Sequence, residues 1–385
     1  MGEQMILGAA FRALGAFPSG WRMPRAERRP QREPQLLVKA AKIAERARFD
    51  YVYFGDWLST GPELETSAPH LLARVDPLSA VAYLAASTRR IGLMTSVNTT
   101  YAEPYSIARQ TASIDLLSGG RLGLNLHVGA NAPAAANYGK DAEWDRLSAY
   151  DRAAEFVDAL RLLWDSWDDD AFIADAAAGR LIEPSRVHPA DYVGRFVQTA
   201  GPLNALPPVQ GSIPIAHGGT SPRAHELVAT RGNLAIADFD SVADAFDYRS
   251  GLRAAALDAG RSPESAPALV VPVLPVVAET SDQAERLANE LLRLIVPGSR
   301  ARVPGILVGD GPTVAAHLAS WFAAGAVDGF QVLSAWMPEQ LEAFARLVVP
   351  ELQARGLVRT EYTGRTLRDH LGLRHPISAY ALGDA

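Results

Sequence analysis

Short apolar segments alternate with segments of helical periodicity along the chain, and this alternation most constrains the fold. Eight apolar segments have the length and the β-branched and aromatic content of buried strands, and these are residues 5–11, 50–56, 91–100, 121–130, 212–219, 233–239, 268–277 and 329–333. Apolar residues recur at helical spacing at 34–49, 76–88, 103–118, 147–167, 222–231, 241–259, 280–293, 312–324 and 338–356. Strands that alternate with helices pair in parallel, and eight of them predict a closed (β/α)8 TIM barrel of the α/β class.

An open, doubly wound sheet that binds a dinucleotide is the competing fold. The turn after the first predicted strand contains no G-x-G-x-x-G motif, and no acidic residue follows at the spacing of that motif. One barrel domain over residues 1–385 is therefore expected. Residues 168–210 interrupt the alternation, and we interpret them as an insertion packed over the barrel mouth, at its C-terminal face. Residues 357–385 are interpreted as a C-terminal extension that packs against the body or a partner subunit.

The composition excludes several classes of protein. The formal net charge is −6, which disfavours nucleic acid and anionic membranes as partners. The chain contains no cysteine, so disulfides and thiolate metal sites are excluded. Glu3 precedes the apolar run near the N-terminus and Arg12 interrupts it, which favours a first strand over a signal peptide. No apolar run reaches the roughly 18 residues of a membrane-spanning helix, so we expect a cytoplasmic protein with no membrane partner.

The residues at the predicted strand ends indicate a cofactor held by hydrogen bonds. In a TIM barrel the active site lies at the C-terminal ends of the strands. Those ends carry Asp56, Ser96, Asn98 and His127, a set rich in hydroxyl and amide groups. Paired carboxylates of the kind that glycosidases use are absent there, as are clustered metal ligands, a nucleophile elbow and a P-loop lysine. No metal site is expected.

The sequence IPIAHGGTSPRAHELVA indicates a binding site for a phosphate group. Gly219 allows close approach of the backbone, and Thr220 and Ser221 supply hydroxyl groups directly before Pro222 opens a helix. The N-terminus of a helix favours an anion. The alternative is an ordinary capped helix whose glycines serve only the turn. Tyr150, on the long helix before this segment, is expected either to point toward the same phosphate or to lie in the core.

The chain resembles the flavin-dependent monooxygenases of the bacterial luciferase-like superfamily, in the branch of the nitrilotriacetate, EDTA and dibenzothiophene-sulfone monooxygenases. The resemblance rests on segments that lie in order along nearly the whole chain, among them FDYVYFGD, IGLMTSVNTTYAEPYSIARQTASIDLLSGGRLGLNL, NYGKDAEWDRLSAYDRAAEFVDALRLLWDSWDDDA, RVHPADYVGRFVQTAGPLN and VVPELQARGLVRTEYTGRTLRDHLGL. It implies a TIM barrel that binds reduced FMN (FMNH2) supplied by a separate NAD(P)H:flavin reductase. It further implies that the protein uses O2 to oxidise a small organic substrate. A homodimer or homotetramer is expected.

Several residues match positions that bind the cofactor in that family. Asp56 matches an acidic residue near the flavin ring, and Ser96 stands where a threonine is usual. Tyr150 matches the tyrosine of an R-Y-x-R-A motif, which reads AYDRA here. Thr220 and Ser221 replace two serines at the phosphate and keep both hydroxyl groups. Asn98 and Gly219 complete the expected contacts with the cofactor.

Three departures from the family pattern put its chemistry in question. The fourth strand ends in His127-Val128-Gly129 where Val-Thr-Ser is usual. Its histidine is either part of the barrel core or a catalytic ring that compensates for the lost hydroxyl groups. Neutral imidazole can donate or accept a hydrogen bond, and imidazolium can stabilise negative charge at the flavin.

Arg146 replaces a helix histidine, and a contact with the phosphate or with an acidic substrate is expected there. The region between about 280 and 312 is also shorter than usual, so the insertion that forms a lid in the family is expected to be shorter in this protein. Two other functions therefore stay open: a dehydrogenase or reductase that uses flavin or deazaflavin on the same fold, and a flavin-binding paralogue without catalytic activity.

Overall fold

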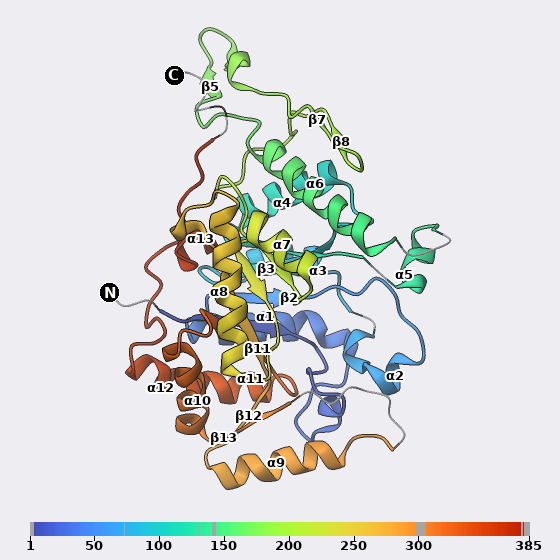
Figure 1. Cartoon of the computed structure of the whole chain (residues 1–385), viewed down its shortest axis with the longest axis vertical. Helices are drawn as coiled ribbons and strands as arrows, with labels where there is room; N and C mark the ends of the chain where they lie inside the picture. The colour runs from blue at the N-terminus through green and yellow to red at the C-terminus, as the bar shows by residue number, and fades with distance from the viewer. Residues whose placement is uncertain are drawn as a thin grey trace.

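Eight parallel strands close into a barrel in the computed structural model, which describes residues 4–72, 74–129, 131–140, 144–297, 305–378 and 380 (Figure 1). The predicted fold class is confirmed. The barrel strands are β1 (Ile6–Phe11), β2 (Tyr51–Phe54), β3 (Gly92–Asn98), β4 (Leu122–His127), β9 (Ile215–Gly218), β10 (Leu234–Ile236), β11 (Ala268–Val273) and β14 (Gly329–Leu333). Each strand pairs with its sequence neighbours, and β1 pairs with β14 to close the ring.

Helices cover the outside of this barrel. The α-helices are α1 (Glu33–Arg46), α2 (Leu64–Ser67), α3 (Pro77–Ala85), α4 (Pro104–Ser118), α5 (Ala132–Asn137), α6 (Arg146–Trp164), α7 (Pro222–Arg231), α8 (Val242–Asp258), α9 (Ser281–Arg293), α10 (Gly311–Ala323), α11 (Glu339–Ala343), α12 (Val349–Ala354) and α13 (Leu367–His370). Short 3-10 turns lie at Gly20–Arg22, Pro30–Arg32, Pro69–Leu71, Pro184–Arg186 and Pro263–Ser265. None of the helices in the described part of the chain is long and apolar enough to cross a membrane.

Proline explains two places where the predicted elements differ from the structure. The predicted strand 268–277 ends at Val273, and Pro275–Val277 forms β12, which pairs with β13 (Leu307–Gly309) outside the barrel. Pro272 is still paired in the barrel, so the strand ends one residue after a position that cannot donate to the ladder. The predicted helix 338–356 is divided by a π-helical turn at Phe344–Val348, directly before Pro350 in α12. A proline removes an intrahelical hydrogen bond and clashes with the preceding turn.

Residues 168–210 do not cover the barrel mouth as expected. They carry two small hairpins, β5 (Phe172–Asp175) with β6 (Arg180–Ile182) and β7 (Tyr192–Val193) with β8 (Gln198–Thr199), at the top of Figure 1. The β7–β8 turn donates backbone hydrogen bonds to Glu155 of α6, and the Asn204 amide donates to the Tyr105 hydroxyl of α4. The segment follows the C-terminal end of α6, so it lies along the outer sides of α4 and α6. The insertions at the C-terminal face are instead the segments that carry α2 and α5.

Arg121 fixes the turn between α4 and β4. Gly119 and Gly120 adopt positive φ angles of 69° and 86°, which glycine tolerates at no steric cost. The Arg121 guanidinium is buried and donates to the carbonyl oxygens of Ala85, Thr88, Ile91 and Ser118. This side chain thereby ties the end of α3 to the starts of β3 and β4.

The C-terminal extension packs against the body and closes the N-terminal end of the barrel. Leu367 has no exposed surface and joins an apolar cluster inside the barrel that contains Ile6, Tyr51, Met94, Ala216, Leu234 and Val270. A Cβ atom at Gly92 or Gly123 would lie 2.5 or 2.6 Å from a Leu367 methyl group, so both glycines are needed for this approach. Arg359 forms an ion pair with buried Asp50, which anchors the same extension. Residues 379 and 381–385 of the extension lie outside the described residues.

Leu367→Ala is expected to lower the free energy of unfolding by about 2–5 kcal/mol, because it leaves a cavity at the closed end of the barrel. Urea unfolding measures the change. Ile377→Ala on the same extension, where the residue is 76% exposed, is the matched control and should cost less than about 0.5 kcal/mol. Equal effects of the two substitutions would mean that the extension does not seal the barrel.

Candidate active site

Four polar side chains from three adjacent strands form a hydrogen-bonded floor at the C-terminal end of the barrel. Tyr53 of β2, Ser96 of β3, and Asn125 and His127 of β4 all point into this region. The Tyr53 hydroxyl lies 3.0 Å from Ser96 Oγ and 3.4 Å from His127 Nε2, and it accepts a hydrogen bond from Asn125 Nδ2 at 3.1 Å. Asn125 Oδ1 is buried and has no hydrogen-bond partner within the described part of the protein. The floor therefore offers an unused acceptor to a bound molecule.

The His127 ring is neutral at neutral pH. Burial, followed by the proximity of His217, lowers the pKa of His127 to about 4. Its backbone carbonyl accepts hydrogen bonds from both the amide and the hydroxyl of Thr99. These bonds fix the end of β4, so the ring is presented from rigid backbone.

A cavity above this floor is lined by Asp56, Asn98 and His127 together with Trp57 and Gly129. Asp56 Oδ1 accepts from the Trp57 amide at 2.8 Å, and burial raises the pKa of this carboxyl group. Asn98 Nδ2 donates to the Gly129 carbonyl at 2.8 Å, and its Oδ1 accepts from the Thr100 amide. Asn98 therefore holds the loop after β4 in place and borders the cavity at the same time.

The β9–α7 turn presents exposed polar groups at a helix N-terminus. Gly219 and Thr220 are exposed, and Gly219 has a φ of +119°, which is strained for any other residue. Ser221 is the N-cap of α7, and its oxygen accepts from the Ala224 amide at 3.3 Å. Its hydroxyl hydrogen is still available to a ligand. The ten-residue helix α7 directs its partial positive charge toward this turn.

Tyr150 makes its hydrogen bond inside the protein. His217 Nδ1 lies 2.8 Å from the Leu126 carbonyl, and because a carbonyl only accepts, this nitrogen carries the hydrogen. Burial lowers the pKa of His217, so the ring is neutral and Nε2 is an acceptor. The Tyr150 hydroxyl, 3.3 Å from Nε2, is the donor. Tyr248 lies beside this pair, and its hydroxyl donates to the Gly219 carbonyl at 3.2 Å.

The predicted residues thus fall into two groups on neighbouring strands. Asp56, Ser96, Asn98 and His127 surround the floor and its cavity. Gly219, Thr220 and Ser221 form the second group, next to Tyr150 through His217 and Tyr248. Arg146 is exposed at the first position of α6, one helical turn before Tyr150 and on the same side of the helix.

Three residues of these groups escaped the sequence analysis, namely Tyr53, Asn125 and Tyr248. Tyr53 and Asn125 precede strand ends, and the alternation of side chains places Asn125 on the same barrel face as His127, two residues later. That spacing was the available signal for Asn125. Tyr248 lies on α8, and no local pattern relates it to the turn after β9. Groups of three or more His, Cys, Asp or Glu residues with metal-binding geometry are absent from the described residues.

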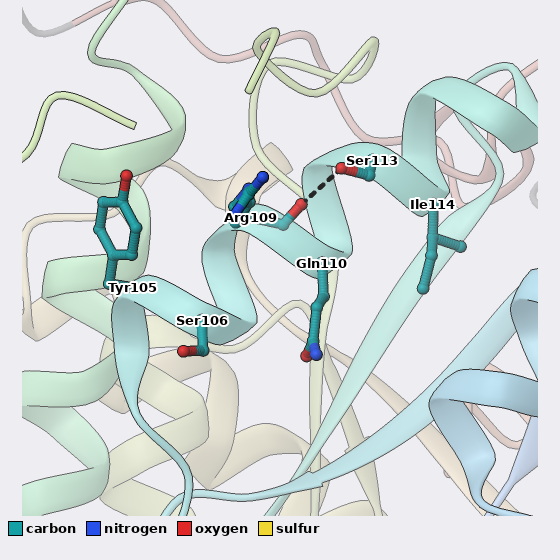
Figure 2. Close-up of a pocket in the computed structure, with 6 residues that line it drawn as sticks. All are labelled: Tyr105, Ser106, Arg109, Gln110, Ser113 and Ile114. Carbon is teal, nitrogen blue, oxygen red and sulfur yellow. Dashed lines mark hydrogen bonds between the residues drawn. The ribbon is translucent and has the colours of Figure 1, made fainter. Parts of the chain in front are cut away.

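A separate hollow lies on the outer face of α4, away from both groups. Figure 2 shows its lining residues, which all belong to this helix, including Tyr105, Arg109 and Ser113. The Ser113 hydroxyl donates to the Arg109 carbonyl one turn earlier. Its polar lining residues are exposed or half-buried, so this hollow lacks the buried polar groups of the barrel mouth.

Comparison with known proteins confirms the resemblance. The sequence profile of the family described as luciferase-like monooxygenase matches residues 19–343. The chain is 29% identical to N-acetyl-S-(2-succino)cysteine monooxygenase of Bacillus subtilis (strain 168), with 98% of this chain and 99% of that protein covered. It is 30% identical to nitrilotriacetate monooxygenase component A of Aminobacter aminovorans, with 98% of each covered. The solved structure of EDTA monooxygenase from Chelativorans sp. BNC1 superposes with a TM-score of 0.86 at 27% identity, covering 97% of this chain and 99% of that one.

The lowered pKa of His127 predicts a loss of stability in acid. The unfolded chain takes up a proton near pH 6.5 and the folded ring only near pH 4, so the contribution of this ring falls as the pH drops through that window. The free energy of unfolding, measured in urea between pH 7 and 4.5, should therefore fall less steeply in His127→Asn than in the wild type. His317→Asn removes an exposed ring on α10 and should retain the wild-type slope. A wild-type slope in His127→Asn would contradict the prediction.

Proposed function

Because the chain belongs to the luciferase-like monooxygenase family, we propose that it is the oxygenase component of a two-component system. Proteins of this family are flavin-dependent monooxygenases. In the proposed system a separate NAD(P)H:flavin reductase supplies FMNH2, and this chain uses O2 to oxidise a small organic substrate. The observation that carries the proposal is similarity over 98% of the chain to a protein named as component A of nitrilotriacetate monooxygenase. Cytoplasmic location and a homodimer or homotetramer remain part of the proposal.

The turn after β9 fits the phosphate of FMN. This turn presents the N-terminus of α7 and the hydroxyl hydrogens of Thr220 and Ser221. At Gly219 the backbone has no Cβ atom, so a ligand can approach it closely. Arg146 is exposed on the same side of α6 as Tyr150 and would add a positive charge. Tyr150 and Tyr248 would position the turn and His217, and the Tyr150 oxygen keeps lone pairs that can accept.

The floor of the barrel mouth fits the ring of a reduced flavin. A reduced flavin carries N–H donors, and Asn125 Oδ1 is a buried acceptor that has no partner in the described residues. Asp56, Ser96 and Asn98 border the same space. When bound, the reduced flavin would supply the two electrons with which O2 yields one oxygen atom for the substrate and one molecule of water.

His127 is the residue we propose as catalytic. Its neutral ring can hold a proton on either nitrogen, and the Tyr53 hydroxyl beside Nε2 can exchange a proton with it. Tyr53 in turn contacts Ser96 and Asn125, so its orientation is fixed by neighbouring strands. In this role His127 replaces the hydroxyl groups that the fourth strand lacks, and burial of the floor excludes water from the proton transfer.

Loss of both hydroxyl groups at the β9–α7 turn should weaken binding of FMN. Thr220→Val combined with Ser221→Ala removes two donors to a charged group, each worth about 1.5–3 kcal/mol, so the affinity should fall at least tenfold. Quenching of FMN fluorescence measures it. Thr280→Ala removes the N-cap of α9, and this control loses a comparable cap without loss of affinity. Wild-type affinity in a folded double variant would place the phosphate elsewhere.

The isolated chain should not oxidise NADH or NADPH at a useful rate, because it contains no dinucleotide-binding motif. Addition of an unrelated flavin reductase with NADH and FMN should start oxygen-dependent product formation, detected by mass spectrometry with labelled O2. His127→Ala should lower product formation about 100-fold while FMN binding is retained. Stoichiometric oxidation of NADPH by the chain alone would contradict the two-component proposal, and FMN binding without product from any candidate substrate would favour a non-catalytic paralogue.

A further inference from the structure

Residues 55–60 divide the barrel mouth into two cavities. Asp56, Trp57, Leu58 and Ser59 line both of them. The first cavity lies on the side of Asn98 and His127, above the floor. The second borders the same loop and is also lined by Leu71, Arg74 and Val75. Two hydrogen bonds hold the loop to the α5 region, from Ser59 Oγ to Asn131 Oδ1 at 3.2 Å and from Asn137 Nδ2 to the Leu58 carbonyl at 2.9 Å.

Arg74 lines the second cavity with most of its hydrogen-bonding capacity unused. Its Nη2 donates to the Phe11 carbonyl at the end of β1, at 3.3 Å. Its Nε is buried without a partner, and none of the described carboxylates lies within ion-pair distance of the guanidinium. An arginine offers five N–H donors in a fixed fork that matches a carboxylate. A largely buried cation in this state is costly to the folded protein unless an anion completes it.

The charged groups around Arg74 are already engaged with the backbone. Glu33 accepts from the Val75 amide and Asp56 accepts from the Trp57 amide, and burial raises the pKa of both carboxyl groups. Arg12, the first residue after β1, is a second largely buried cation; burial and then the proximity of Arg74 lower the pKa of Arg12, and Asp238 faces it. Burial also lowers the pKa of Arg74, which Glu33 and Asp56 offset only in part. Two neighbouring guanidinium groups repel each other, so a shared anion would stabilise both.

We propose that the second cavity is a subsite for an organic carboxylate, which Arg74 binds directly and Arg12 attracts. The substrate of the proposed oxygenase is then an acidic compound, and this identification of its class rests on the proposed function. Because Asp56, Trp57, Leu58 and Ser59 line both cavities, a molecule whose carboxylate is held at Arg74 can extend past Trp57 toward the floor. Arg74 thereby selects among substrates by charge and sets their orientation.

Binding of succinate and of its neutral analogue succinamide to the purified chain tests this subsite without flavin. Titration calorimetry should show that succinate binds at least tenfold more tightly than succinamide. Arg74→Gln should abolish the difference, and Arg74→Lys, which keeps the charge, should retain part of it. Arg109→Gln removes an arginine from the α4 hollow shown in Figure 2 and should leave the preference unchanged.

Parallel titrations with FMN separate this inference from the proposed function. Unchanged FMN affinity in Arg74→Gln, together with loss of the succinate preference, supports the subsite. Equal binding of succinate and succinamide by the wild type would overturn it. So would a preference that survives in Arg74→Gln, or one that Arg109→Gln abolishes. If Arg74→Gln fails to fold, a reduced but measurable preference in Arg74→Lys, with unchanged FMN affinity, supports the proposal, and a wild type without the preference still overturns it. Weak FMN binding by a wild type that prefers succinate would instead contradict the proposed function alone.

Discussion

Closure of the barrel between β1 and β14 is the constraint on which the site depends. Ile6 is paired with Gly329, and a Cβ atom on that glycine would lie 2.1 Å from the Ile6 carbonyl oxygen. Only glycine lets the strands approach in this register. Once the ring is closed, the C-terminal ends of all eight strands meet at one rim. Side chains more than 70 residues apart in the sequence, such as those of Tyr53 and His127, then contact each other at this rim.

The two ends of the barrel differ in polarity, and this difference shapes the electrostatics of the mouth. Leu367 and its apolar neighbours fill the closed end, and the polar floor lies at the opposite end. At the mouth, burial lowers the pKa of His127 and of Arg74 and raises that of Asp56. All three shifts have the same cause, because burial disfavours the charged form of each group. It therefore lowers the pKa of a base and raises the pKa of an acid. A group that stays charged there, as arginine does, therefore interacts strongly with a ligand.

Periodicity made the barrel predictable, since each strand and each long helix has its own local pattern. The phosphate-type turn at residues 219–221 was also a local signal, and the structure places it at the N-terminus of α7. The partners of these residues were not predictable in this way. Tyr248 reaches Gly219 from another helix, and Arg74 lies in a connection without periodicity between β2 and α3. The predicted strand 268–277 and the predicted helix 338–356 differ from the structure at prolines. A proline interrupts a strand ladder or a helix even where the apolar pattern of the sequence continues.

In the proposed oxygenase, His127 and Arg74 would have separate roles toward an acidic substrate. A positively charged histidine at the floor would compete with Arg74 for a carboxylate and draw it toward the reacting centre. Because burial keeps the His127 ring neutral, Arg74 and Arg12 are the fixed positive charges on the β1–β2 side of the mouth among the described residues. A carboxylate would then be held away from the floor, and the uncharged part of the molecule would face His127. Burial makes an unpaired arginine costly in the free protein. The same burial keeps His127 neutral, and so it would determine which end of an acidic molecule faces the floor.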